Sequence, residues 1–214
     1  MSKIVIFGAG GQAGRTIAAE AAGRGHQVTA VLRDPDRAPE QLRGMALVAG
    51  DATDKDAARD LVAGADVVVV AIGGPGRSLW RDAAEALVTA IGDLPEPRPR
   101  IIHMGGGATL LGPEGTPFLE SPSFPAAYLD PATGQAAALD YYRSTDGSVT
   151  WTYFSPPPVD FHPGARTGSY RIGHDEPVVD DEGKSTLSYE DFAVAIVDEI
   201  ERPRHPNERI TAAY

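Results

Sequence analysis

The sequence predicts an α/β fold, a single domain with a doubly wound parallel sheet and helices on both of its faces. Three observations predict it. Apolar strand patterns alternate with helix patterns along most of the 214 residues, as in sheets built from strand-helix-strand units. The run 66–72 is apolar throughout, which is typical of a strand buried on both faces. A glycine-rich turn joins the first apolar run, 3–7, to a helix pattern. We expect one domain over residues 1–214, with a small loop-rich substrate lobe at about 155–185.

Composition argues against several classes of function. The net charge is −11, and an acidic surface repels phosphate backbones and anionic membranes, so we expect no nucleic-acid or membrane partner. The chain has no cysteine, no signal-like segment and no long apolar run, which predicts a cytoplasmic protein without disulfides or membrane spans. We also expect no metal site, and either a monomer or a homodimer.

The first strand-helix-strand unit carries the glycine motif. Its glycines are spaced Gly8-x-x-Gly11-x-x-Gly14, between the strand at 3–7 and a helix expected at 13–23. A strand that bends sharply into a helix needs positive φ angles and a close approach of its backbone to the ligand, which Gly8 and Gly11 would supply. At Gly14 a missing side chain lets the helix pack on the sheet. The free amide groups and the dipole of the helix would face a pyrophosphate, so the unit predicts dinucleotide binding in a Rossmann-like domain.

Two versions of this motif fit the residues. The spacing that ends at Gly14 is the short-chain and extended dehydrogenase pattern, whereas Gly8-x-Gly10-x-x-Ala13 fits the other Rossmann form. We prefer the first. The backbone expected to hold the cofactor comprises Gly8, Gly10, Gly11, Gln12, Ala13 and Gly14.

The end of the second strand, 27–33, bears on the choice of cofactor. An acidic residue here would accept hydrogen bonds from the ribose of NAD, whereas an arginine accommodates the 2′-phosphate of NADP. Arg33 comes first, and Arg37 follows the turn at Asp34. The alternative is a solvated loop in which Asp34 only initiates a turn. We expect NADP(H) to be preferred over NAD(H), with Arg33 and Arg37 in its site.

In the rest of the chain, strand patterns continue to alternate with helix patterns, and two long irregular segments interrupt them. Irregular segments at 110–131 and 160–181 are rich in loops and aromatic residues, and segments this long are usually functional. We expect the first to wall a substrate pocket. The second is either a solvated loop or a small lobe that closes over the substrate. Strand patterns lie at 46–49, 66–72, 100–104, 149–154 and 209–212, and helix patterns at 55–62, 78–91, 135–143 and 188–201.

The carboxyl ends of parallel strands share one edge of the sheet, so the residues after each strand are further candidates for the cofactor site. Contact with adenine and plain turn chemistry explain Asp51 equally well. Glycines after the fourth strand would let the backbone pass under the cofactor, and the end of the sixth strand should approach the nicotinamide. These candidates are Asp51, Ala52, Gly73, Gly74, Met104, Gly105, Ser155 and Pro156.

The chain lacks the proton-relay pair of most short-chain dehydrogenases. Those enzymes use a tyrosine with a lysine four residues later, and the lysine lowers the pKa of the tyrosine so that it can exchange the substrate proton. The only lysines here are Lys3, Lys55 and Lys184, and none follows a tyrosine at that spacing. Ordinary alcohol or ketone chemistry lacks its usual acid and base, which also disfavours an isomerase or epimerase.

Nearly the whole chain resembles the atypical short-chain dehydrogenases known as NAD(P)H-dependent flavin reductases, which are related to biliverdin-IX-beta reductase. A whole superfamily shares the first matching motif, but the last three are more specific. The matching stretches are 8–14, 28–33, 50–54, 104–106, 151–156, 163–168 and 188–191.

This resemblance implies hydride transfer from NADPH to a planar conjugated acceptor such as a flavin, a quinone or a tetrapyrrole. Reduced acceptors of this kind delocalise charge and take a proton from solvent, so proximity and stacking could supply most of the rate. Thr109 matches the family's serine or threonine after the fifth strand, which implies a role in orienting the substrate. Some similar proteins look more like regulators, and the prolines at 156–158 would crowd the nicotinamide. The alternative is a non-catalytic NADP-binding sensor that controls a partner protein.

Overall fold

The computed structural model describes residues 1–214 and confirms the predicted α/β architecture. Its main sheet has eight strands in the order β3-β2-β1-β4-β5-β6-β10-β8, and the order reverses between β1 and β4, as in doubly wound sheets. All neighbouring pairs are parallel except β10 and β8. The strands are β1 (Lys3–Phe7), β2 (Gln27–Leu32), β3 (Ala46–Ala49), β4 (Val67–Val70), β5 (Arg100–Met104), β6 (Trp151–Ser155), β8 (Arg171–Gly173) and β10 (Glu208–Ala213).

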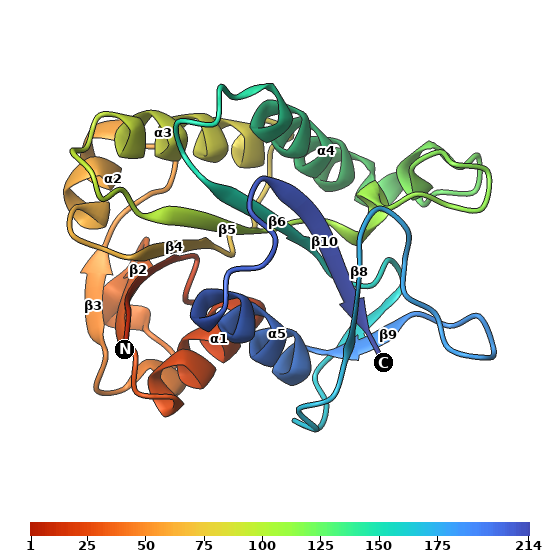
Figure 1. Ribbon diagram of the computed structural model, residues 1–214, viewed down its shortest axis with the longest axis horizontal. Helices are drawn as coiled ribbons and strands as arrows, with labels where there is room; N and C mark the ends of the chain where they lie inside the picture. Colours follow the sequence, from red (N-terminus) through yellow and green to blue (C-terminus); the bar gives the residue numbers. More distant parts are fainter.

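Helices cover both faces of this sheet (Figure 1). On one face lie α1 (Gln12–Gly23) and α5 (Tyr189–Glu201), and on the other α2 (Lys55–Val62), α3 (Leu79–Gly92) and α4 (Leu129–Ser144). Each face has its own apolar core between sheet and helices. No helix combines the length and the apolar character that crossing a bilayer requires.

β4 shows why the run 66–72 has no polar alternation. Val67 and Val69 belong to the core beneath α1 and α5, whereas Val68 and Val70 belong to the core beneath α2, α3 and α4. All four side chains are buried, because β1 and β5 flank the strand and helices cover both of its faces. The prediction of a strand buried on both faces is therefore confirmed.

The start of α4 differs from the prediction. The helix begins at Leu129, not near residue 135, and its first turns contain Pro131 and Gly134, which interrupt a helix pattern in sequence. Proline is tolerated there because the first amide groups of a helix have no partner within it. A Cβ on Gly134 would lie 2.3 Å from the carbonyl oxygen of Arg77 and 2.6 Å from the Trp80 ring, so close packing requires glycine. The other predicted helices and strands lie within two residues of their expected bounds.

The segment 160–181, predicted to be irregular, contains short strands. β7 (Asp160–His162) pairs in parallel with β9 (Thr186–Ser188) in a separate two-stranded sheet, and β8 extends the main sheet. Each of these strands spans three residues, too few for an alternation to be recognised in sequence. By contrast, the segment 110–131 is irregular before α4, as expected, with single 3-10 turns and one isolated bridge between Leu111 and Pro117.

Asp191 anchors the lobe to α5. Its carboxylate is buried and accepts hydrogen bonds from the amides of Thr167 and Gly168, at 3.1 and 2.7 Å, and from the hydroxyl of Tyr214 at 2.8 Å. Burial by itself would raise the pKa of Asp191, but these hydrogen bonds outweigh it and hold the pKa below its usual value. The carboxylate is therefore ionised at neutral pH and fixes the segment around Thr167 in place.

Candidate cofactor-binding site

A large cavity opens at the carboxyl ends of β1 to β5. Its volume is about 990 Å³, at the upper end of the usual range for small-molecule sites. It spans the switch point between β1 and β4, where this topology places a dinucleotide. The residues that line it are Phe7, Gly8, Gly10, Gly11, Gln12, Ala13, Val31, Leu32, Arg33, Asp34, Arg37, Gly50, Asp51, Ala52, Ala71, Ile72, Gly73, Gly74, Pro75, Leu79, Met104 and Tyr189.

The glycine turn forms the floor of the cavity. Gly8 has a φ of +79°, as predicted, and a Cβ there would lie 2.3 Å from the carbonyl oxygen of Ala71. A Cβ on Gly14 would lie 2.2 Å from the carbonyl oxygen of Gly8, so Gly14 permits the close packing of α1 on the turn. Gly11 differs from the expectation, because its φ of −73° is one that any residue adopts. It serves as the exposed N-cap of α1 and supplies no positive φ.

The first turn of α1 has amide groups that nothing in the protein satisfies. The amides of Gln12, Ala13 and Gly14 have no acceptor, and no side chain caps the helix. α1 is also the one α-helix without an acidic residue in its first turn. Carboxylates at such positions stabilise a helix, and here the positive end of the dipole is left for another anion. This end of the cavity therefore fits the pyrophosphate of a dinucleotide.

The charged residues of the cavity lie after β2 and β3. Arg33 and Arg37 are exposed, and neither forms an ion pair within the protein. The carboxylate of Asp34 accepts a hydrogen bond from the amide of Asp36 at 3.2 Å, which is turn chemistry. Asp51 accepts from the Thr53 amide at 2.9 Å and also lines the cavity, so both of its expected roles remain compatible with the structure.

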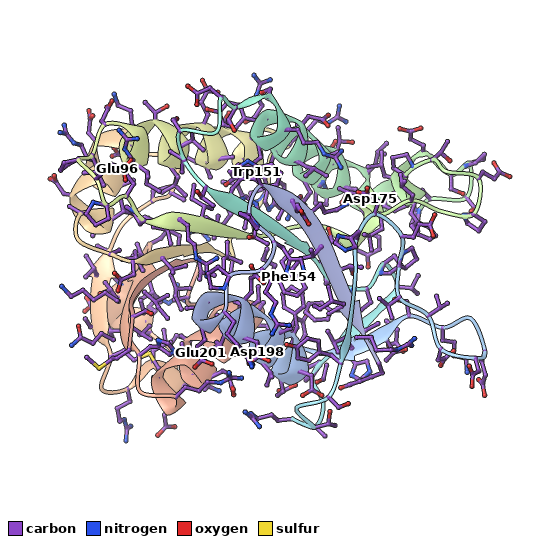
Figure 2. All side chains as sticks on the ribbon, in the orientation of Figure 1. Glu96, Trp151, Phe154, Asp175, Asp198 and Glu201 are labelled. Atoms are coloured by element: carbon purple, nitrogen blue, oxygen red, sulfur yellow. The ribbon has the colours of Figure 1, made fainter.

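Thr109 does not line this cavity. Its hydroxyl is buried and donates to the carbonyl of Gly106 at 2.7 Å, with the Ser155 hydroxyl 3.4 Å away. The buried guanidinium of Arg209 donates to the Thr109 carbonyl and pairs with Asp175, which Figure 2 labels between α4 and β8. These bonds brace the turn after β5. They do not support the substrate-orienting role that the resemblance implied for Thr109.

Gly105, Ser155 and Pro156 also lie outside the cavity lining. A Cβ on Gly105 would lie 2.0 Å from the Tyr153 ring, so this glycine serves packing. Ser155 is fully buried. The prolines after β6 pack on Gly107, where a Cβ would lie 2.7 Å from the carbonyl oxygen of Pro156. The crowding of the nicotinamide expected from the triple proline is therefore not supported, and no residue of 110–131 lines the cavity either.

His103 is a core residue within β5. It is fully buried, its Nδ1 lies 3.1 Å from the Tyr142 hydroxyl, and its ring stacks on Tyr153 at 5.3 Å. Burial lowers the pKa of His103 to about 3, and the Gln135 side chain acts in the opposite direction. The imidazole is therefore neutral at physiological pH and lies outside the cavity lining.

Sequence reasoning missed both aromatic residues of the cavity lining, Phe7 at the end of β1 and Tyr189. Tyr189 lines the cavity from the first position of α5, directly after the helix-capping Ser188. The local pattern at 188–191 indicates a helix start, and that is what it forms. Nothing in this pattern shows that the folded lobe brings Tyr189 to the cofactor side of the sheet.

Comparison with known proteins shows the family of the chain. The sequence matches the model of a family described as NAD(P)H-binding over residues 8–203. The chain belongs to this NAD(P)H-binding family. Residues 8–203 contain the glycine turn, the arginines after β2 and every other lining residue except Phe7. The uncharacterised protein YwnB of Bacillus subtilis is 38% identical over 213 residues, which are 98% of this chain and 97% of YwnB.

Two solved structures extend the likeness. A protein of Burkholderia pseudomallei, provisionally described as exported, is 38% identical with a TM-score of 0.88 over 100% of both chains. A protein of Streptococcus pneumoniae, provisionally described as an NADH-flavin reductase, is 30% identical with a TM-score of 0.87 over 100% of this chain and 99% of that one. The likeness to the Streptococcus pneumoniae protein agrees with the resemblance to NAD(P)H-dependent flavin reductases. The chain is an oxidoreductase-like member of the NAD(P)H-binding family.

Proposed function

We propose that the protein is an NADPH-dependent reductase that transfers hydride to a planar conjugated acceptor such as a flavin or a quinone. The observation that carries this proposal is the uneven distribution of charged residues, which all lie on one side of the cavity. Its four charged lining residues all follow β2 or β3, on the side where the arginines predict the adenosine half of the cofactor. They are Arg33, Asp34, Arg37 and Asp51.

The opposite side of the cavity is uncharged. Its lining after β4 and β5 includes Ile72, Pro75, Leu79 and Met104, and Tyr189 adds an aromatic ring to the cavity. An apolar wall with one aromatic ring suits the flat, uncharged ring of a flavin or a quinone. No lysine or histidine lines the cavity. An acceptor whose reduced form delocalises charge needs no positioned acid-base pair, because it takes its proton from solvent.

The residues fit NADPH along the rest of the cavity. The free amides of Gln12 and Ala13 would bind the pyrophosphate, and the unpaired guanidinium groups of Arg33 and Arg37 would bind the 2′-phosphate. Bound NADPH supplies the hydride. The protein contributes placement, because it holds the cofactor at fixed points on one side and leaves the acceptor an apolar surface on the other.

The test is steady-state oxidation of NADPH by the purified protein with FMN, riboflavin and a quinone, followed by the near-ultraviolet absorbance of the reduced coenzyme. We expect saturable turnover with at least one acceptor, faster with NADPH than with NADH. Absence of turnover with every acceptor, in a protein that binds NADPH, would reject the reductase. Turnover that favours NADH would reject the cofactor preference.

The second candidate is a non-catalytic NADP-binding sensor that controls a partner protein. Two exposed apolar side chains on the lobe are available for contact with such a partner: Val159 is 88% exposed and Val179 is 42% exposed. The sensor predicts tight NADP binding without turnover, and a partner that is retained in one redox state of the cofactor only.

A further inference from the structure

Tyr189 is the single contribution of the C-terminal part of the chain to the cavity. Every other lining residue lies between Phe7 and Met104. The side chain of Ser188 accepts a hydrogen bond from the Asp191 amide at 3.0 Å and so fixes the start of α5, where Tyr189 is the first residue. The Tyr189 side chain is therefore the only part of the chain after Met104 that lines the cavity.

The ring of Tyr189 is supported from behind by aromatic side chains. Its centroid lies 4.1 Å from that of Phe161, which lies 5.2 Å from that of Phe192 in an edge-to-face arrangement. Phe192 packs in turn on Phe154 at 5.0 Å, and Figure 2 labels Phe154 between the sheet and α5. Phe154 and Phe192 are fully buried. The series connects the cavity wall to the core, so the Tyr189 ring is held in place without any ligand.

The hydroxyl of Tyr189 makes no hydrogen bond within the protein. Tyr189 itself is half-buried. The hydroxyls of four other tyrosines have partners within the protein: Tyr142, Tyr153, Tyr170 and Tyr214. Tyr189 thus brings a donor without a partner in the protein to a cavity whose lining after β4 and β5 carries no charge. A donor that no protein group occupies is available to a ligand that brings an acceptor atom.

We infer that Tyr189 positions the hydride acceptor, an inference that rests on the proposed reductase function. Its ring forms the wall against which the planar acceptor lies, and its hydroxyl donates a hydrogen bond to a ring carbonyl oxygen. Flavins and quinones both carry such carbonyls. Because the dinucleotide is held at the glycine turn and at the arginines, Tyr189 contributes to binding of the acceptor and not of the cofactor.

The test measures binding of riboflavin to protein saturated with NADP⁺, by quenching of flavin fluorescence. Tyr189→Leu removes the ring and the hydroxyl, and we expect the flavin Kd to rise about tenfold. Tyr189→Phe keeps the ring, and the Kd should rise about threefold from one lost hydrogen bond. The Kd of NADP⁺ should stay unchanged in both. Tyr128→Leu is the matched control, because Tyr128 is 64% exposed and lies outside the cavity lining.

In steady-state kinetics with riboflavin, Tyr189→Leu should raise KM more than Tyr189→Phe does, and kcat should stay nearly unchanged in both variants. A flavin Kd for Tyr189→Leu equal to that of Tyr128→Leu would overturn the inference and leave the reductase intact. An equal loss of NADP⁺ and flavin binding would also overturn it, because Tyr189 would then contact the cofactor. Flavin binding that weakens as expected in a protein without turnover would reject the reductase and keep Tyr189 as an acceptor contact. Failure of the NADP⁺-saturated wild-type protein to bind riboflavin or a quinone would reject both.

Discussion

Replacement of Gly14 by alanine should damage the fold and the cofactor site together, because the added methyl group has no space. The Cβ would lie 2.2 Å from the carbonyl oxygen of Gly8 and 2.9 Å from the Cα of Ala9. Both contacts are with the backbone of the turn, so no rotation of a side chain relieves them. Overpacking of this kind costs about 1–3 kcal/mol, and relief requires α1 to move away from the turn that it supports.

The size of the effect can be followed by thermal unfolding. For a chain of this length each kcal/mol lowers Tm by about 2–4 °C, so Gly14→Ala should lower it by about 2–12 °C. NADPH at a hundred times its Kd should stabilise the wild-type protein by about 2.7 kcal/mol. The variant should lose most of that stabilisation, because displacement of α1 moves its free amides away from the pyrophosphate.

Gly23→Ala is the matched control, since it changes the same residue type in the same helix. A Cβ on Gly23 meets nothing within 4 Å, so alanine there should leave Tm unchanged or raise it by the helix propensity gain of up to about 1 kcal/mol. Its response to NADPH should equal that of the wild-type protein. The reasoning would be refuted if Gly14→Ala unfolded at the wild-type temperature with the wild-type response to NADPH.

Further predictions concern the arginine, the threonine and the buried carboxylate. Arg33→Ala should weaken NADPH binding about 10- to 100-fold in calorimetry and NADH binding little, because charge-assisted hydrogen bonds to the 2′-phosphate are lost. Arg43→Ala, outside the cavity, is the control and should change the binding of neither coenzyme. Equal losses of NADPH and NADH binding in Arg33→Ala would contradict the preference for NADPH. Thr109→Ala should lower the free energy of unfolding by about 0.5–1.5 kcal/mol through the lost bond to Gly106, with kcat unchanged; a lower kcat at unchanged stability would restore the orienting role. The lowered pKa of Asp191 stabilises the folded state above the unfolded pKa of about 4, and this contribution is lost as pH falls through the folded pKa. Urea unfolding should therefore show that Asp191→Asn is less stable at neutral pH and loses less stability in acid, whereas identical pH profiles would contradict the assignment.

The sequence predicted most of the sheet because its signals there are local. The apolar run at β4 indicates burial on both faces, and in the structure its side chains pack into two cores, one on each face of the sheet. The start of α4 could not be predicted, because Pro131 and Gly134 are helix breakers in isolation. Only the contacts of Gly134 with Arg77 and Trp80 explain why the helix contains it. The lobe strands were missed since three residues carry no periodic pattern.

For the site, local chemistry was again the predictable part. Gly8 and Gly14 follow from the geometry of a strand that turns into a helix, and the structure shows the contacts that exclude side chains at both. Tyr189 was out of reach because its place depends on how the lobe folds against α5, far from the glycine turn in sequence. At Thr109 a position that matches a family motif holds a hydroxyl bonded inside the protein, so its orienting role stays a prediction.

The central claim is that an anionic dinucleotide binds against the free amides at the start of α1. The most direct measurement is an NMR titration of the wild-type protein with NADPH, observing backbone amide shifts. The account predicts saturable shifts that are largest at Gln12, Ala13 and Gly14, with little change at Val197 and Ile200 on the far part of α5. No shift at the three α1 amides at saturating NADPH and NADH would contradict it.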